Sequence, residues 1–506
     1  MLPRLLVVWL LSGMSVANAL ASAKATKHFI GIDLGTSGCR ISVLESKSES
    51  GTKSLPLQEV YAKAVLWQED CPYDDASSWV KATRDLIRSA SLDVPSIATT
   101  LSSICISGTS ASCVVMDRSN GKATRKTRMY NYSVGGDNTA QQAALKRLVE
   151  HAPQKHTATS PTGSLAKLLA WQAESALKEN EVLAHQADYV VSQLLGPSAS
   201  VDHSLWKVVS DWHNCLKLGY DVRQLAWPEW LQSCLKEEGL NPAKVLPDKV
   251  VSPGQPVGQI HPSVAKELGV APSTQLVGGT TDSNAAFMAA AENPTLGTAV
   301  TSLGSTLAIK LLSPIYVEDA TYGVYSHRFP KVLLPDDAAS NSSSDDSEET
   351  WLVGGASNVG CTIFRELQFS NDELADLSKG IDPVERSPYE YYPLVKPGER
   401  FPVADPNKQP VLEPCPESRQ EFLKGLLESL TSVEVDGFAR LHEMGAPWPS
   451  KVWTCGGGAR NDAWMAMRED RLRYRIGKNT TIVARAPHVE ASYGAATLAA
   501  ASFTMS

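Results

Sequence analysis

A repeated strand-turn-strand pattern, with glycine and small hydroxyl residues at its tip, constrains the fold of this chain more than any other feature. The pattern occurs first in residues 28–45, where two runs rich in β-forming residues flank the turn at 35–38. It occurs again in residues 297–312, around the turn at 304–306. Backbone N–H groups in such turns form anion-binding sites. Two of these turns facing each other across a cleft can hold phosphates from both sides.

Two further glycine-rich segments follow apolar strands and precede predicted helices. They read GGTTDSNAAF at 278–287 and CGGGARNDAW at 455–464. Glycine at such a junction lets a ligand approach the backbone closely, and the helix N-terminus favours an anion. One glycine turn alone is weak evidence, because any hairpin can contain one. Four such segments in this order are much more specific.

In order and context, the four segments resemble the carbohydrate kinases of the FGGY type, from His28 to nearly the end of the chain. The resemblance implies an α/β chain with the two-domain actin-like ATPase (ribonuclease H-like) fold and a cleft between the domains. Residues 28–289 would form the first domain and 290–481 the second, while a C-terminal helix within 482–506 packs back on the first. It also implies a small-molecule sugar and ATP with Mg²⁺ as ligands.

Within this family, the chain is most similar to the D-ribulose kinases of plants and cyanobacteria. The similarity lies in ISGTSASCVVMDRSNG at 106–121, TSLGSTLAIKLLS at 301–313, WLVGGASNVG at 351–360 and GERFPV at 398–403. Xylulokinases typically have a Gln-Met-His segment where this chain has Thr-Ser-Ala at 109–111. The implied activity is ATP-dependent phosphorylation of the terminal hydroxyl of a ketopentose, with D-ribulose converted to D-ribulose 5-phosphate.

Two aspartates are the candidate catalytic and substrate-binding residues. Transfer of a phosphoryl group to a sugar needs a base that accepts the hydroxyl proton. Asp282 matches the catalytic aspartate of the family and would contact the sugar as well, although an Asp before an Ala-rich helix can also be an N-cap. Asp33, at the end of the first strand, would hold magnesium and contact the reacting hydroxyl.

The glycine turns supply the candidate ATP-binding residues that the resemblance implies. The first turn would bind phosphates from one side, the second from the other, and the late glycines with the helix after them would bind adenine. A tryptophan at helical spacing also fits a core position, so Trp464 has two readings. The predicted ATP-binding residues are Thr36, Ser37, Gly38, Gly304, Ser305, Thr306, Gly457, Gly458, Asn461 and Trp464.

Sugar recognition is less well defined by the sequence. Ser110 is the main candidate for a sugar contact and Thr109 a weaker one, and either could instead cap a turn. The family commonly has an acidic residue where this chain has Tyr132. Two alternatives therefore stay open: a kinase for xylulose, another pentulose or a polyol, and a kinase-like ATP-binding protein with weak or lost catalysis.

Composition and the chain termini bear on partners and location. With 47 Lys and Arg against 55 Asp and Glu, the formal charge is −8, which argues against nucleic acid as a partner. Residues 1–24 have a signal-peptide pattern too short to span a bilayer, and no other segment is apolar enough to do so. One destination consistent with a kinase is a complex plastid; the secretory pathway and the cytoplasm are alternatives. The acidic run at 336–349 predicts a disordered loop.

Overall fold

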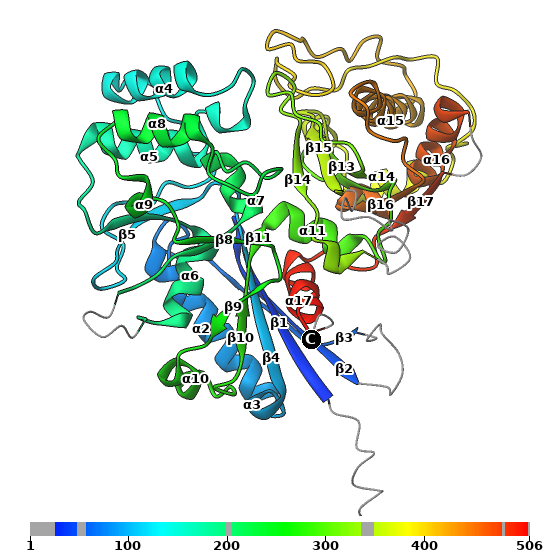
Figure 1. Cartoon of the computed structure of the whole chain (residues 1–506). Coiled ribbons are helices and arrows are strands. Elements are labelled where there is room, and N and C mark those ends of the chain that lie inside the picture. The colour runs from blue at the N-terminus through cyan, green and yellow to red at the C-terminus, as the bar shows by residue number, and fades with distance from the viewer. Residues whose placement is uncertain (1–25, 48–56, 199–204, 335–348, 478–480, 504–506) are drawn as a thin grey trace, which may run out of the picture.

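The computed structural model describes residues 26–47, 57–198, 205–334, 349–477 and 481–503, which form two mixed α/β halves, each built around its own sheet (Figure 1). The predicted targeting segment at 1–24 lies outside the described residues, as does the acidic run at 336–349 apart from its last residue. Among the described helices, none is both long and apolar enough to cross a bilayer.

The first sheet has β1 near its centre, and seven of the nine β1 residues are buried. This strand is apolar on both faces, as expected for a strand covered on both sides. It pairs antiparallel with β2 and parallel with β4. The order is β3-β2-β1-β4-β10-β9 with β11 beside β4: β1 (Thr26–Leu34), β2 (Gly38–Lys47), β3 (Leu57–Leu66), β4 (Leu101–Gly108), β9 (Pro256–Gln259), β10 (Gln275–Val277) and β11 (Thr280–Thr281).

The second sheet contains the second predicted hairpin, β12 and β13, paired antiparallel. Strand β12 also pairs in parallel with β16, so it occupies the place that β1 has in the first sheet. The order is β14-β15-β13-β12-β16-β17: β12 (Thr298–Leu303), β13 (Leu307–Ser313), β14 (Tyr325–Arg328), β15 (Trp351–Ala356), β16 (Lys451–Cys455) and β17 (Ile482–Arg485). The sheet thus extends to Arg485, past the domain boundary expected at 481.

Two helices lie between the sheets, and other helices cover the outer faces (Figure 1). Helices α11 (Asp282–Ala290) and α17 (Ala491–Ala501) pack on each other, and α17 also packs on β1 and β4. On the first sheet, α2 (Ala76–Asp93) and α6 (Gln186–Leu195) pack together, with α2 against β2 and α6 against β4. On the second sheet, α15 (Arg419–Glu443) packs against β13 and β15, and α16 (Asp462–Ile476) packs against α15 and β17. One hydrophobic cluster contains Phe29, Phe287, Trp453 and Leu498, so it joins both sheets through α11 and α17.

Two glycines allow the close approach of α17 to its neighbours. A Cβ atom on Gly31 of β1 would lie 1.9 Å from the carbonyl oxygen of Ser492, and one on Gly494 would lie 1.9 Å from that of Ala285. Both contacts are with backbone atoms, which cannot move aside as a flexible side chain can. These glycines therefore fix the position of α17, and with it the start of α11, against the first sheet.

A largely helical subdomain follows β4 in the chain and has its own core. It contains β5 (Cys113–Asp117), β6 (Glu181–His185), α4 (Thr139–His151), α5 (Ser164–Glu174), α8 (Glu229–Glu237) and α9 (Pro242–Val245). The shorter remaining elements are α3 (Ile97–Thr100), η1 (Thr157–Thr159), β7 (Val209–Asp211), α7 (Trp212–Cys215), η2 (Leu216–Leu218), β8 (Lys249–Val251), α10 (Pro262–Leu268), η3 (Lys331–Leu333), α13 (Thr362–Glu366), α14 (Asn371–Ser378) and η4 (Gly457–Arg460).

Candidate active site

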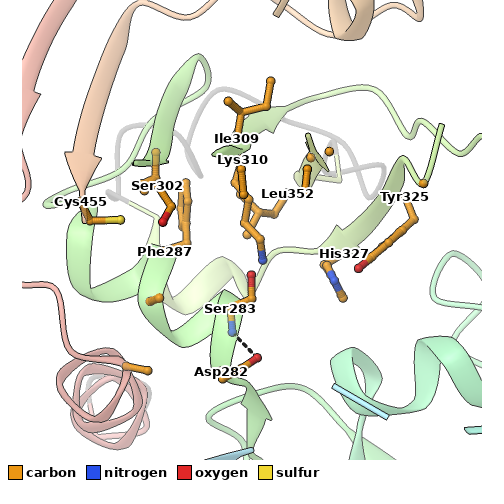
Figure 2. Close-up of a pocket in the computed structure, with 18 of the residues that line it drawn as sticks. Asp282, Ser283, Phe287, Ser302, Ile309, Lys310, Tyr325, His327, Leu352 and Cys455 are labelled. Atoms are coloured by element: carbon orange, nitrogen blue, oxygen red, sulfur yellow. Dashed lines mark hydrogen bonds between the residues drawn. The ribbon is translucent and has the colours of Figure 1, made fainter. Parts of the chain in front are cut away.

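A cavity of about 630 Å³ lies between the two halves of the molecule. Its wall combines both predicted aspartates with residues of the second sheet, several of which point into the cavity from β13, β14 and β16 (Figure 2). The charged and polar residues that line it include Asp33, Lys217, Asp282, Ser283, Ser302, Lys310, Tyr325, His327, Arg400 and Glu490.

Asp33 is the penultimate residue of β1, and its side chain is almost fully buried. The hydroxyl of Ser107 on β4 donates a hydrogen bond of 2.9 Å to Asp33 Oδ1, and Arg40 Nη1 lies 3.7 Å from Oδ2. Burial raises the pKa of Asp33 to about 7, and the nearby carboxylate of Asp282 acts in the same direction. The site therefore makes ionisation of Asp33 unfavourable unless a cation compensates for it.

Asp282 is the first residue of α11, directly after β11. Thr281 occupies the N-cap position and makes no side-chain capping hydrogen bond, so Asp282 is the first helical residue and not the N-cap considered for it. Asp282 Oδ1 accepts a hydrogen bond of 2.6 Å from the backbone N–H of Ser283. Burial raises the pKa of Asp282, while that hydrogen bond and the charges of Lys310 and Lys217 oppose the rise. Asp282 is thus a carboxylate that faces the cavity with an increased proton affinity.

The donor set fits a magnesium ion at Asp33. Magnesium is usually held by one or two carboxylates together with water and substrate phosphates. Asp33 and Asp282 line the same cavity, and the charge of Asp282 adds to the rise in the pKa of Asp33. A divalent cation bound there would compensate for the two negative charges. Asp33 would hold the ion, and the ion would neutralise part of the charge on a bound triphosphate.

The two predicted phosphate-binding turns have similar local structures. In the first, the N–H of Gly35 donates to the carbonyl of Gly38 at 3.0 Å, and Thr36 and Ser37 are exposed. In the second, the N–H of Gly304 donates to the carbonyl of Thr306 at 3.2 Å, and Ser305 and Thr306 are exposed. The cavity wall is made by the residues next to these turns, namely Asp33 before the first, and Ser302 and Ala308 on either side of the second.

The late glycines divide into two environments. A Cβ atom on Gly457 would meet nothing within 4 Å, so this residue borders open space. A Cβ atom on Gly458 would lie 2.5 Å from the ring of Trp464, so this glycine makes room for a core side chain. Asn461 is the N-cap of α16, accepting from the N–H of Trp464 at 3.0 Å, and its amide donates to Ser378 at 2.8 Å.

Trp464 packs inside the second half of the molecule. It is 2% exposed, its indole N–H donates to the hydroxyl of Thr431 at 2.9 Å, and its ring meets Phe364 edge-on at 6.1 Å. In this conformation neither ring face is open to a ligand. Stacking on adenine therefore stays a prediction, and the geometry favours the core position that tryptophan spacing also allowed.

The residues considered for sugar recognition lie around the turn after β4 and in the helical subdomain. Ser110 is partly exposed in that turn. Thr109 is buried and donates to the side-chain oxygen of Gln186 from both its N–H, at 2.9 Å, and its hydroxyl, at 3.0 Å. The hydroxyl of Tyr132 accepts from Gln141 at 2.9 Å, and the guanidinium of Arg128 lies over its ring at 4.8 Å. Thr109 and Tyr132 thus have packing and hydrogen-bonding roles.

Sequence reasoning missed several residues that shape the cavity. Arg40 contacts Asp33 and also lies 3.2 Å from Glu490, and its place opposite Asp33 in the β1–β2 hairpin could have revealed it. Lys310 lies four residues after the second glycine turn, in a segment used only for its resemblance. Lys217 is in the short helix η2, where no motif marks it.

Comparison with known proteins gives relatives over most of the chain. The xylulose kinase of Bacillus subtilis (strain 168) is 23% identical over 461 residues, covering 89% of this chain and 85% of the relative. The xylulose kinase of Escherichia coli (strain K12) is 26% identical over 471 residues, covering 89% and 86%. No family model matches the sequence.

Solved structures give the same fold. The crystal structure of Plasmodium falciparum glycerol kinase with ADP superposes with a TM-score of 0.72 at 15% identity, covering 95% of this chain and 90% of that one. The chain therefore has the two-domain actin-like ATPase fold of sugar kinases, as the sequence predicted.

Proposed function

We propose that this chain is an ATP-dependent sugar kinase that transfers the γ-phosphoryl group of ATP to the terminal hydroxyl of a ketopentose. It is an enzyme of the class of phosphotransferases with an alcohol group as acceptor. The observation that supports this function best is the presence of Asp33 and Asp282 in one cavity between two halves, with an exposed glycine turn from each half at its border. Small-molecule sugar and ATP are the ligands.

Each carboxylate has a distinct role in this proposal. Asp282 accepts the proton of the attacking hydroxyl, and its raised pKa brings it closer to the pH at which a general base works best. Asp33 holds the magnesium ion that accompanies the triphosphate. Since both side chains lie between the two halves, closure around the ligands excludes water and limits loss of ATP to hydrolysis.

D-Ribulose is the proposed sugar. The support is the resemblance of four segments to D-ribulose kinases and the Thr-Ser-Ala sequence at 109–111, where Ser110 is the partly exposed member. D-Xylulose is the second candidate, because the two relatives named above are xylulose kinases. Tyr132 replaces an acidic residue of the family and is engaged in packing. A protein that binds ATP and transfers phosphate poorly is the remaining alternative.

The experiment measures ADP formation by the purified protein with magnesium and ATP across D-ribulose, D-xylulose, L-ribulose, glycerol and no sugar. Asp282→Asn is the matched control, because it keeps the size of the side chain and removes the base. Preference for D-ribulose, lost in Asp282→Asn, supports the proposal. A preference for D-xylulose replaces the proposed sugar but keeps the reaction, whereas turnover that no sugar increases contradicts the reaction itself.

We also propose that the protein acts in a complex plastid, which its signal-like residues 1–24 would reach through the secretory pathway. A fluorescent protein fused after residue 30 tests in cells where the N-terminal segment directs a protein. Accumulation within the plastid supports it, and retention in the cytoplasm or secretion contradicts it.

A further inference from the structure

Lys310 places a positive charge inside the cavity from the side opposite Asp33. It lies on β13, where Ala308, Ile309 and Lys310 line the cavity, while Leu307 and Leu311 are buried. Figure 2 shows the Lys310 side chain reaching from β13 toward Ser283 at the start of α11. The second half of the molecule thus presents an ammonium group at the place where the first half presents its candidate base.

The neighbouring strands make room for this side chain. Lys310 pairs with Gly354 of β15 on one side and with Val300 of β12 on the other. A Cβ atom on Gly354 would lie 3.1 Å from Lys310 Cγ and 2.4 Å from the carbonyl oxygen of Ile309. Any larger residue at 354 would press on the lysine stem, so the glycine keeps the lysine in its path across the cavity.

The charge of Lys310 has only a neutral hydrogen-bond partner in the described part of the chain. The ammonium donates to the amide oxygen of Asn284 on α11, and none of the ion pairs among the described residues includes it. Asp282 attracts it through space from the same helix, and Lys217 repels it. A partly buried ammonium group with only a neutral partner is unfavourable unless an anion completes its surroundings.

Burial lowers the pKa of Lys310 to about 7, with Lys217 adding to the decrease and Asp282 opposing it. A bound phosphate would favour the charged ammonium, because opposite charges stabilise each other at short range. The site is therefore prepared for an anion beside Asp282. The hydroxyl that Asp282 activates attacks the γ-phosphorus, so the transferring group must also pass beside this carboxylate.

We propose that Lys310 is a catalytic residue whose ammonium binds an oxygen of the transferring γ-phosphoryl group beside Asp282. The inference rests on the proposed function in its choice of ligand. The β- and γ-phosphates differ in one respect that makes the assignment testable: ATP contains the transferring group, and ADP lacks it. Lys310 therefore discriminates between the two nucleotides, whereas a residue that only supports the fold treats them alike.

The experiment titrates wild-type protein, Lys310→Met and Lys310→Arg with ADP and with the β,γ-imido analogue of ATP, in magnesium buffer without sugar. In Lys310→Met we expect the analogue to bind about ten- to hundredfold more weakly, as for a lost hydrogen bond between charged groups, and ADP to change by less than about twofold. Lys310→Arg retains part of the analogue affinity because it keeps the charge. Lys451→Met is the matched control on β16 of the same sheet, outside the cavity lining, and leaves both affinities unchanged.

If Lys310→Met lowers the affinity for both nucleotides equally, the proposal is overturned, because a general change in the fold or in the electrostatic field of the cavity has that effect. Unchanged analogue affinity would overturn it as well. Thermal unfolding of each variant establishes that the compared proteins are folded. Because these titrations need no sugar, a selective loss supports Lys310 even if the sugar panel finds no acceptor, so failure of the proposed reaction is distinguishable from failure of this inference.

Discussion

Replacing Asp33 by Asn should stabilise the protein while removing its proposed magnesium ligand. The side chain is 5% exposed, and burial raises its pKa from 3.8 to about 7. The folded protein thus binds this proton more tightly than the unfolded chain does. Stability therefore falls as pH rises between these two values, by about 1.4 kcal/mol per pH unit, and the full cost is present above pH 7.

The magnitude follows from the difference between the two pKa values. About 3 units correspond to about 4 kcal/mol of destabilisation in the wild type at pH 8, which Asn avoids because it does not ionise. Asn can still accept the hydrogen bond from Ser107. The stability gained by Asp33→Asn should therefore grow from about 1.6 kcal/mol at pH 5 to about 4 kcal/mol at pH 8.

Thermal unfolding at pH 5, 6, 7 and 8, in EDTA and without nucleotide, measures this difference. At about 1 °C per kcal/mol for a chain of this length, Asp33→Asn should melt roughly 4 °C above the wild type at pH 8. Asp117→Asn is the control: although burial opposes it, hydrogen bonds from Ser119 and Asn180 hold the pKa of Asp117 below its ordinary value, so this variant gains nothing as pH rises. A gain in Asp33→Asn that is absent at pH 8, or equal at all four pH values, would refute the reasoning.

Three further predictions concern the candidate base and the core of the second half. Asp282→Ala should lower sugar phosphorylation by about 10²–10⁴-fold, with nucleotide affinity in calorimetry changed only a few-fold. Trp464→Ala should lower the free energy of unfolding by about 3–5 kcal/mol, because the ring is buried; a stable variant with ATP binding weakened by about 1–3 kcal/mol would instead indicate stacking on adenine. Glu434→Gln should cost about 3–5 kcal/mol in urea unfolding, because it leaves the buried guanidinium of Arg468 without its carboxylate; an unchanged midpoint would contradict this.

The parts of the fold that sequence predicted are those set by local chemistry. The hairpin at 28–45 was predicted from β-forming runs and a glycine turn, and the structure forms it as β1 and β2. Residues 186–195 have the apolar spacing of a helix, and the structure forms α6 there. After the late glycines, residues 459–468 also have a helical pattern, but the helix begins only at Asp462, after the 3₁₀ turn η4, because Asn461 caps it there. Apolar spacing does not reveal an N-cap at Asn461, three residues after the last of the glycines.

Two adjacent residues of the same type can have different structural roles, and the sequence alone does not show which residue has which role. Gly457 and Gly458 are adjacent and were assigned together to nucleotide binding, yet Gly457 borders open space and Gly458 lies under the ring of Trp464. The difference depends on where α16 packs, which is a tertiary property. Thr109 and Ser110 differ in the same way, since Thr109 is committed to Gln186 on α6 while Ser110 stays partly exposed.

Lys310 shows most clearly which part of the candidate site could not be predicted from the sequence. In LAIKLLS a single lysine stands among apolar residues, and nothing in the sequence shows what its face of the strand meets. That face becomes a cavity wall only because α11 and α17 join the two sheets in one hydrophobic cluster, and α17 approaches β1 where Gly31 has no side chain. Residues almost 280 positions before Lys310 therefore determine that its charge faces Asp282. A motif records residues that are close in sequence, whereas the chemistry of this cleft depends on side chains from two sheets.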